Sequence, residues 1–250
     1  MMSLTKVSLW EIVKRQYAYK LKAYIQVFMS MVIVQLIAIL FSQGSSGMMA
    51  SSGGLIDLEL RYYSADVVVG FTILWGFITA ILITTKAYRN DDFILVTNRL
   101  SSNLSNVLFL LTASIVGGIT SMLTTFLVKI IVFIFKSSFL IISPVNLAGV
   151  MDLLIGTGVT TLYILLFSAI GYMVGTLVQL SRAFAVVLPV IFVGGLILDG
   201  LRGQDGVIAA LVKFFFMETS FVLFIVKVLA TAVLMFCGAF ILSNKMEVKP

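Results

Sequence analysis

Six long apolar runs alternate with short polar segments along this chain. They lie near residues 23–41, 67–85, 107–128, 150–178, 184–198 and 221–242. A helix needs about 20 mostly apolar residues to cross a bilayer, and only the fifth run is clearly shorter. Because the runs are continuous and do not alternate with polar residues, they predict helices and not a barrel. We expect an all-α integral membrane protein in which residues 1–250 form a single transmembrane domain.

Composition strengthens this prediction. Hydrophobic residues make up 60% of the chain and charged residues 11%, against roughly 25% charged residues in soluble domains. A long charged segment precedes the first run and no small-residue cleavage site follows it, so we expect a retained span and not a signal peptide. The single cysteine, Cys237, lies in the last run, which excludes a disulfide framework within the chain.

The positions of lysine and arginine predict the orientation. Six spans place both termini on one side, and eleven of the seventeen basic residues fall on that side, with four on the other and two inside spans. The positive-inside rule then puts both termini in the cytoplasm, and a bacterial plasma membrane is the expected location. The net charge of +6 is expected to serve topology and contact with anionic lipid, not nucleic-acid binding.

Two segments on the predicted cytoplasmic side carry helical signals. Residues 3–22 repeat apolar side chains every three or four positions, as an amphipathic helix in the membrane interface does. Such a helix is either a simple anchor or one that also docks a partner. The loop 86–106 holds a short apolar stretch flanked by charged and helix-capping residues. It predicts a short surface helix near 90–100, with an ordinary interfacial connector as the alternative.

The two predicted outer segments differ from each other. The first outer loop, 42–66, begins with a run of glycine and serine, and we expect a flexible linker too short to form a core. The outer region 199–220 contains an apolar segment, 206–217, bounded by charge. Because that segment is too short to cross, it is expected to enter the outer leaflet and return as a re-entrant segment.

Several kinds of chemistry can be set aside. The chain has no histidine, so it cannot assemble a histidine metal site or a Ser/His/Asp triad by itself. It also lacks the GxxxxGK[ST] phosphate-binding loop through which many ATPases bind nucleotide. We therefore expect no catalytic, cofactor-binding or metal-binding residue, and no enzyme activity of the chain alone.

Three ionisable residues fall inside the apolar runs: Lys129, Asp152 and Lys227. Charges in a bilayer are costly and often functional, and all three come out near the outer interface. They form either an ion-paired outer cluster or a set of separate residues in which the lysines extend to the interface. The predicted spans lack the carboxylate pair near the midplane that ion-coupled transporters commonly use.

Polar and amphipathic side chains within the spans are candidates for lining a translocation path. The strongest are Gln35, Trp75 and Thr79, although sequence does not fix the direction in which each one points. Gly171 and Gly175 form a GxxxG pattern, which permits close approach of helices. We interpret it as packing within the bundle in preference to dimerisation.

This layout resembles the permease subunits of type-2 ABC transporters, most of which are exporters, over essentially the whole chain. In that family a cytoplasmic amphipathic helix precedes six spans, a coupling helix separates spans two and three, and a re-entrant segment separates spans five and six. Residues 3–22, 90–100 and 206–217 take these places here. The stretch FILVTNRLSSNLSN at 93–106 is similar to the one that leads the family from its coupling helix into span three.

The resemblance implies a division of labour between subunits. ATP and Mg²⁺ would bind to a separate cytoplasmic ATPase, and the chain would pair in the membrane with a second copy or a related permease. Within the coupling segment, Asp91, Asp92, Phe93 and Arg99 would contact the ATPase. Phe93 would be the apolar anchor of that contact and the charged residues its rim.

The expected cargo is hydrophobic or amphipathic, with a peptide or an antibiotic favoured, because the sequence contains no large external domain and no charged vestibule. Two other classes stay open. One is an ion-coupled secondary transporter, and the other is a non-transporting membrane protein such as an immunity or sensor protein. Neither accounts as well for the predicted cytoplasmic helix between spans two and three.

Overall fold

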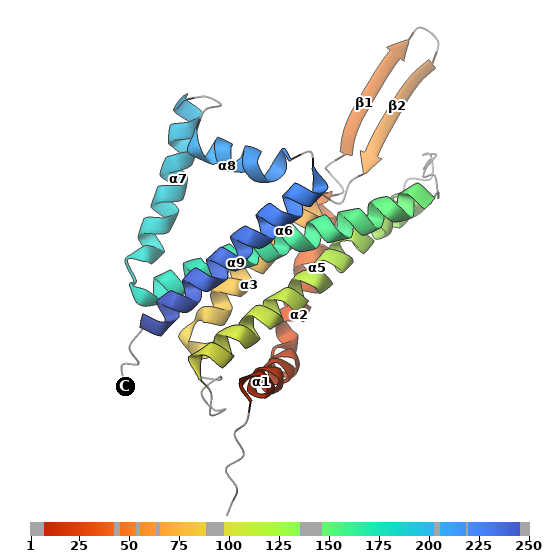
Figure 1. Ribbon diagram of the computed structural model, residues 1–250. Coiled ribbons are helices and arrows are strands. Elements are labelled where there is room, and N and C mark those ends of the chain that lie inside the picture. The colour runs from red at the N-terminus through yellow and green to blue at the C-terminus, as the bar shows by residue number, and fades with distance from the viewer. Residues whose placement is uncertain are drawn as a thin grey trace, which may run out of the picture.

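The computed structural model describes residues 8–42, 46–53, 56–63, 66–88, 98–135, 147–202, 206–218 and 220–245. Most of these residues are helical (Figure 1). The helices are α1 (Leu9–Ala23), α2 (Ile25–Ser42), α3 (Asp66–Thr84), α5 (Arg99–Phe135), α6 (Leu147–Leu180), α7 (Phe184–Arg202), α8 (Val207–Phe216) and α9 (Phe221–Lys245). The strands β1 (Ser46–Gly53) and β2 (Ile56–Tyr63) form one antiparallel ribbon.

Six helices within the described residues are long and apolar enough to cross a membrane, namely α2, α3, α5, α6, α7 and α9. The prediction of a helical, multi-pass membrane protein is thus confirmed. Helices α5 and α6 contain 37 and 34 residues. At about 1.5 Å per residue they are far longer than the roughly 30 Å of hydrocarbon in a bilayer. Each helix therefore continues past its apolar run, through polar residues that the hydropathy pattern assigned to loops.

The ribbon corrects the expectation of a flexible linker at the start of the loop 42–66. Ser46 pairs with Tyr63 and Gly53 with Ile56, in register along the whole length of both strands. The sequence did contain a signal for this structure, since IDLELRYY at 56–63 alternates apolar and charged residues as a strand does. The glycine and serine residues of β1 concealed it, because they have low strand propensity.

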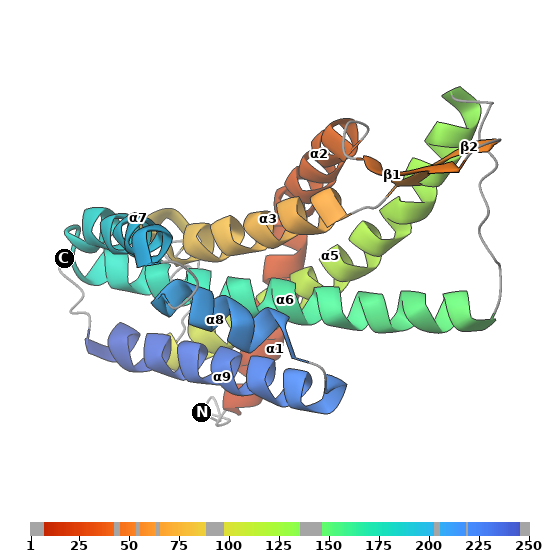
Figure 2. The ribbon, with the colours of Figure 1, turned by 90° about the horizontal axis from the view of Figure 1, so that it is seen from above.

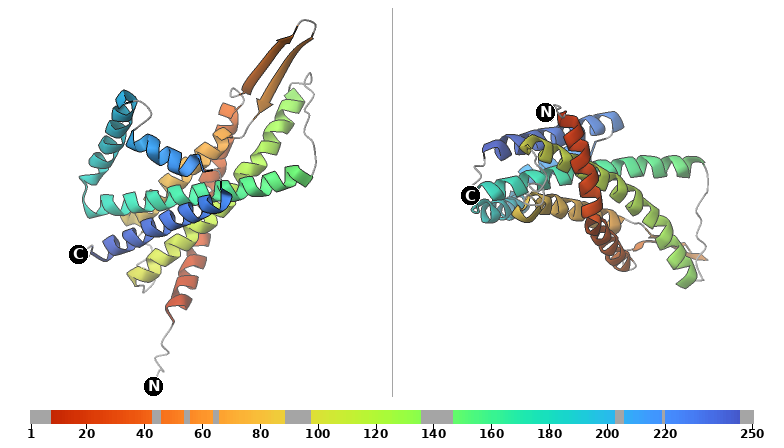
Figure 3. Two further views of the ribbon diagram at one scale, coloured as in Figure 1. Left: turned by 45° about the horizontal axis from the view of Figure 1, so that its top comes forward. Right: turned by 90° about the horizontal axis from the view of Figure 1, so that it is seen from below.

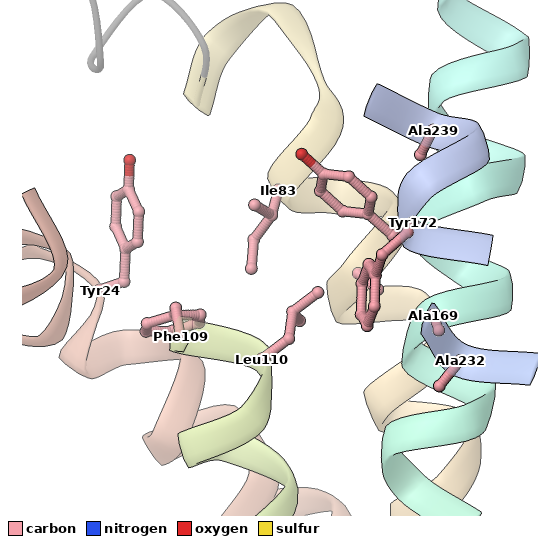
Figure 4. Packing of buried hydrophobic residues seen from close by; sticks show 10 residues of the cluster. Tyr24, Ile83, Phe109, Leu110, Ala169, Tyr172, Ala232 and Ala239 are labelled. Atoms are coloured by element: carbon pink, nitrogen blue, oxygen red, sulfur yellow. The ribbon is translucent and has the colours of Figure 1, made fainter. Parts of the chain in front are cut away.

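Helix α6 lies at the centre of the bundle, between α3 and α9 (Figure 2). The main core cluster draws its buried side chains from several helices, and most of them are seen from close by in Figure 4. Its buried members are Tyr24, Ala80, Ile83, Phe109, Leu110, Ala169, Tyr172, Ala232, Phe236 and Ala239. Three of the five buried members from α6 and α9 are alanines. Such small side chains let these two helices pack closely.

The contact between α3 and α6 depends on glycine. A Cβ on Gly171 would clash with the backbone oxygen of Phe77, and one on Gly175 would clash with the hydroxyl of Thr84. Gly76, on α3, faces α6 in the same way, because a Cβ there would lie 2.9 Å from Cγ2 of Ile164. The GxxxG pattern thus packs against a neighbouring helix of the same chain, as the sequence interpretation favoured.

The two ends of the bundle differ. Helix α1 and the last turn of α9 lie at one end, and the β-ribbon lies at the other (Figures 1 and 3). We call these the α1 end and the ribbon end. Helix α7 rises from the last turn of α6 and is joined to α9 through α8 (Figure 1). No residue of its candidate span is buried, so α7 is the most exposed of the six described spans.

The glycine contact leads to a stability prediction. Gly171→Ala should lower the free energy of unfolding by about 1–3 kcal/mol, the usual cost of overpacking a tight interface. Gly158→Ala is the matched control on the same helix, because a Cβ at Gly158 meets nothing within 4 Å. Thermal unfolding in a mild detergent measures both variants. Equal midpoints for the two would contradict the proposed role of Gly171.

Candidate functional site: a polar network at the α1 end

Helix α1 begins with a capped turn. The hydroxyl of Ser8 accepts a hydrogen bond from the Glu11 backbone N–H at 3.3 Å, which satisfies one of the free donors at the helix start. The face of α1 that packs on the bundle carries Val13, Gln16 and Lys20, all buried. Trp10, one of the apolar residues that recur along the predicted amphipathic helix 3–22 and form its apolar stripe, is 53% exposed. The buried face is thus offset from the apolar stripe and includes a lysine.

Lys20 is 1% exposed and lies against the first turns of α5. Its Nζ donates to the Ser105 hydroxyl at 2.8 Å, to Asn106 Oδ1 at 2.5 Å and to the Ser102 carbonyl at 3.5 Å. A buried ammonium group is tolerated only when oxygen atoms replace its lost water. Three oxygens of α5 do so here, and they fix the position of α1.

The same asparagine continues the contact to α6. Asn106 Nδ2 donates to the Tyr172 hydroxyl at 3.3 Å, and that hydroxyl donates to Asn103 Oδ1 at 3.0 Å. All of these side chains are buried, so the bonds form in a region of low polarity, where hydrogen bonds are strong. We call this group the Lys20 network. It consists of Lys20, Ser102, Asn103, Ser105, Asn106 and Tyr172.

Two further contacts tie the first half of α5 to its neighbours. The Arg99 guanidinium donates to the carbonyls of Ser243 at 3.2 Å and Asn244 at 3.4 Å, in the last turn of α9. A cation at the end of a helix also favours its dipole. The hydroxyls of Tyr17 and Thr112 share a hydrogen bond of 2.9 Å between α1 and α5. Helix α5 is thereby joined to α1, α6 and α9 near its beginning.

Of the four residues predicted to contact an ATPase, the structure describes only Arg99. Asp91, Asp92 and Phe93 fall outside the described residues, as does most of the predicted helix at 90–100. Arg99 is the first residue of α5 and is directed to the carbonyls of α9. The last two residues of the predicted coupling helix, 99 and 100, therefore belong to α5.

The three predicted path residues meet where α2 packs on α3. Gln35 Nε2 donates to the hydroxyls of Thr120 at 2.9 Å and Thr72 at 3.3 Å. Trp75 Nε1 donates to the Ser30 hydroxyl at 3.0 Å, and Thr79 lies one turn further along α3. Gln35, Trp75 and Thr79 are 6%, 5% and 5% exposed. Within one chain, the hydrogen bonds of Gln35 and Trp75 therefore hold α2 against α3 and α5.

Of the three charged residues predicted near the outer interface, the structure describes the side chains of Asp152 and Lys227, and these two do not pair with each other. Lys227 pairs with Glu218, and its Nζ lies 4.3 Å from the centre of the Phe214 ring. Asp152 is exposed and makes no ion pair with any described residue. The side chain of Lys129 is not among those described. The partner of Lys227 comes from the turn between α8 and α9, a local contact that the spacing of spans does not reveal.

Helix α8 is held at both ends. Asp199 Oδ2, from α7, accepts the backbone N–H groups of Ile208 at 2.6 Å and Ala209 at 3.0 Å. The N-cap itself is Gly206, where a Cβ would clash with the Asp199 carboxylate. At the other end, the Tyr163 hydroxyl donates to the Phe215 carbonyl at 2.9 Å.

Asp199 should therefore control the order of α8. Asp199→Ala removes the cap and should cost about 1 kcal/mol of local stability, seen as faster hydrogen exchange at the amides of Ile208 and Ala209. Asp152→Ala is the control, because that carboxylate is exposed and has no ion pair among the described residues. If α8 exchanges equally in both variants, the cap does not stabilise the helix.

The Lys20 network makes a second prediction. Lys20→Met keeps the length of the side chain but leaves buried oxygens without a donor, which should cost about 1–3 kcal/mol. Lys22→Met, on an exposed position of the same helix, should change stability by no more than about 0.5 kcal/mol.

A double-mutant cycle with Tyr172→Phe tests whether the network acts as a unit. We expect a coupling of about 0.5 kcal/mol or more between positions 20 and 172 in detergent unfolding. Additive effects would mean that the contacts of α1 and of α6 with α5 are independent.

Comparison of the chain with models of protein families, with curated proteins and with solved structures gives no significant match. The described residues also contain no group of three or more histidine, cysteine or acidic side chains placed to hold a metal ion. What the fold identifies is a helical, multi-pass membrane protein with six membrane-capable helices in its described part.

Proposed function

We propose that this chain is the membrane-spanning permease subunit of an ATP-driven exporter of the type-2 ABC class, coupled to a separate cytoplasmic ATPase that binds ATP and Mg²⁺. The Lys20 network is the observation that carries the proposal. Its α5 residues come directly after the predicted coupling helix at 90–100, and its hydrogen bonds join the first turns of α5 to α1 and α6. A displacement of the segment would reach α5 first and the rest of the bundle through these bonds.

The length of α5 supports this coupling. It is one continuous helix of 37 residues, and it runs from the α1 end toward the ribbon end (Figure 3). A helix transmits displacement along its axis because each turn is hydrogen-bonded to the next. Buried contacts with α6 and α3 give it neighbours along that length. Movement started at residue 99 would therefore be felt on the opposite side of the membrane.

We place the α1 end in the cytoplasm, following the distribution of lysine and arginine. The exposed face of α1 agrees with an interfacial position. Trp10 and Tyr19 are 53% and 43% exposed, and Lys14 Nζ lies 5.6 Å from the centre of the Trp10 ring. Aromatic rings and lysines together are typical of the head-group region.

We propose that α8 is the outer re-entrant segment. It has ten residues and no buried residue, and Val207 and Leu211 are 74% and 53% exposed. A helix that enters lipid must satisfy its free backbone groups. Asp199 does so for two of the N–H groups of α8.

A second permease, identical or related, completes the proposed complex. The exposed apolar surface of α7, which includes Val186, Val190 and Ile191, is available to lipid or to that second permease. The cargo proposed is hydrophobic or amphipathic, such as a peptide or an antibiotic. The predicted path residues Gln35, Trp75 and Thr79 are uncharged, in keeping with such a cargo.

One observation favours a second candidate, a non-transporting membrane partner such as an immunity or sensor protein. Gln35 and Trp75 are buried and hydrogen-bonded within the chain, which suits a protein whose helices stay in one arrangement. The presence or absence of an ATPase partner separates the two candidates.

Purification of the tagged chain from its native membrane in mild detergent, followed by mass spectrometry, tests the proposal. We expect a stoichiometric partner that carries a Walker A motif. Phe93→Ala and Asp92→Ala should reduce its recovery at least several-fold, because anchor residues dominate binding energy. Phe221→Ala and Asp152→Ala, at the opposite end of the bundle, are the matched controls. Reproducible absence of any ATPase would overturn the proposal and favour the non-transporting partner.

A further inference from the structure

A cavity of about 200 Å³ lies between α2 and α3 near the α1 end. Its position follows from its lining, since Gln26 is the second residue of α2 and Tyr88 lies just beyond the end of α3. Gln26, Ser30 and Leu82 are exposed, whereas Thr79 and Ile83 are buried. The exposed residues thus mark the mouth of the cavity and the buried ones its floor. Val27 completes the lining.

The hydroxyl of Thr79 is unusual among the threonines of the spans. Thr72, Thr112 and Thr176 each donate to the carbonyl four residues earlier, at 2.7, 2.6 and 2.8 Å. This bond is the usual way to satisfy a hydroxyl inside a membrane helix. Thr79 is 5% exposed, yet within the described residues its hydroxyl makes no hydrogen bond. The oxygen is not one of the buried polar atoms that lack a hydrogen-bond partner, so it is open to the cavity that Thr79 lines.

The walls around Thr79 are fixed by other contacts. The Ser30 hydroxyl donates to the Val27 carbonyl at 2.7 Å and accepts from Trp75 Nε1 at 3.0 Å. The Tyr88 ring packs edge-on against Tyr24, with ring centres 4.8 Å apart. The cavity is therefore bordered by side chains with defined positions. The Thr79 hydroxyl makes no hydrogen bond within the described residues and faces this cavity, so a ligand there gains a hydrogen bond without breaking one inside the protein.

The lining defines the kind of ligand. No charged side chain lines the cavity, whereas Gln26, Thr79 and Tyr88 offer an amide and two hydroxyls beside apolar Val27, Leu82 and Ile83. A charged group placed here would lose its water without gaining a counter-charge from the lining. An alcohol or an amide would gain hydrogen bonds. The cavity is smaller than the roughly 300 Å³ of whole-ligand sites, so it suits a head group whose chain continues into lipid.

We propose that the α2–α3 cavity binds the head group of an uncharged amphiphile, an alkyl chain that bears a hydroxyl or an amide, with the Thr79 hydroxyl as its main polar contact. The amphiphile reaches the cavity from the inner leaflet, past Leu82. Two parts of this inference rest on the proposed function. They are the assignment to the inner leaflet and the interpretation of the cavity as the first binding site for cargo. The binding chemistry itself rests only on the lining residues.

Photolabelling tests this inference on the purified full chain in phosphatidylcholine nanodiscs, without any ATPase. The probe is a monoacylglycerol whose acyl chain carries a diazirine, and labelled peptides are located by mass spectrometry. We expect saturable labelling on the peptides of α2 and α3 that line the cavity. Thr79→Val, which has nearly the same shape but no hydroxyl, should weaken the apparent affinity about fivefold, the loss expected for one hydrogen bond.

Two further variants separate binding from folding. Leu82→Trp should abolish saturable labelling by filling the mouth, where Leu82 is 47% exposed. Thr231→Val, on α9, is the matched control, because its hydroxyl already donates to the Lys227 carbonyl at 2.7 Å; its labelling should equal that of the unaltered chain. Equal labelling of Thr79→Val and the unaltered chain would overturn the inference, as would equally strong labelling by a lysophosphatidylcholine of the same chain length.

The result is separable from the fate of the proposed function. If labelling is saturable and depends on Thr79 but the chain copurifies with no ATPase, the binding-site inference stands and the exporter proposal is wrong. With an ATPase present, a cargo should be displaced on addition of ATP, whereas a resident lipid should stay. If the chain copurifies with an ATPase but shows no saturable labelling, the binding-site inference is wrong and the exporter proposal stands.

Discussion

The backbone contact between α3 and α6 at Gly171 and Gly175 is the constraint on which the rest of the bundle depends. In lipid, apolar side chains gain little by leaving the solvent, so helices associate through close packing and hydrogen bonds. Glycine lets α6 approach the backbone of α3 at Phe77 and Ile81. Tyr172 follows Gly171 directly, so the same approach sets the depth at which its hydroxyl meets Asn103 and Asn106. Packing and polar contacts are therefore parts of one arrangement.

The polar contacts at the α1 end fix the position of α1 relative to α5 more than they raise the free energy of unfolding. Lys20 is buried with oxygen partners from α5, and such a group holds α1 in one position, since any slide would leave an ammonium group without oxygens. The arrangement is not fully satisfied, however. Both polar atoms of the Gln16 side chain, and Asn103 Nδ2, are buried without a hydrogen-bond partner among the described residues. Each unpaired group costs about 1–3 kcal/mol, so the buried polar groups at the α1 end add less net stability than their number suggests.

Sequence predicts the parts of this fold that are encoded locally. The six spans follow from apolar length. In a chain with 19 glycines, a GxxxG pattern is weak evidence for dimerisation, which favoured packing of Gly171 and Gly175 within the bundle. The burial of Lys20 has no local signal, because its partners lie 82 to 86 residues away and a lysine extended to the interface has the same sequence pattern. The facing of Gln35, Trp75 and Thr79 depends on which helix packs on α2 and α3, and hydropathy carries no information about pairing. The ribbon is different, since its second strand did have the alternation of a strand.

The unequal attachment of the spans indicates where a conformational change would be absorbed. Helix α5 is tied to α1, α6 and α9 near its first turns, and α6 is packed on α3 through glycine, so these helices form one unit. Helix α7 has no buried residue in its span. It is joined to that unit through the end of α6 and through α8, which Asp199 and Tyr163 hold by hydrogen bonds. A span without buried residues separates at lower cost than a packed helix interface does. Among the described spans, α7 is therefore the one that a rearrangement of the bundle would displace at the lowest cost.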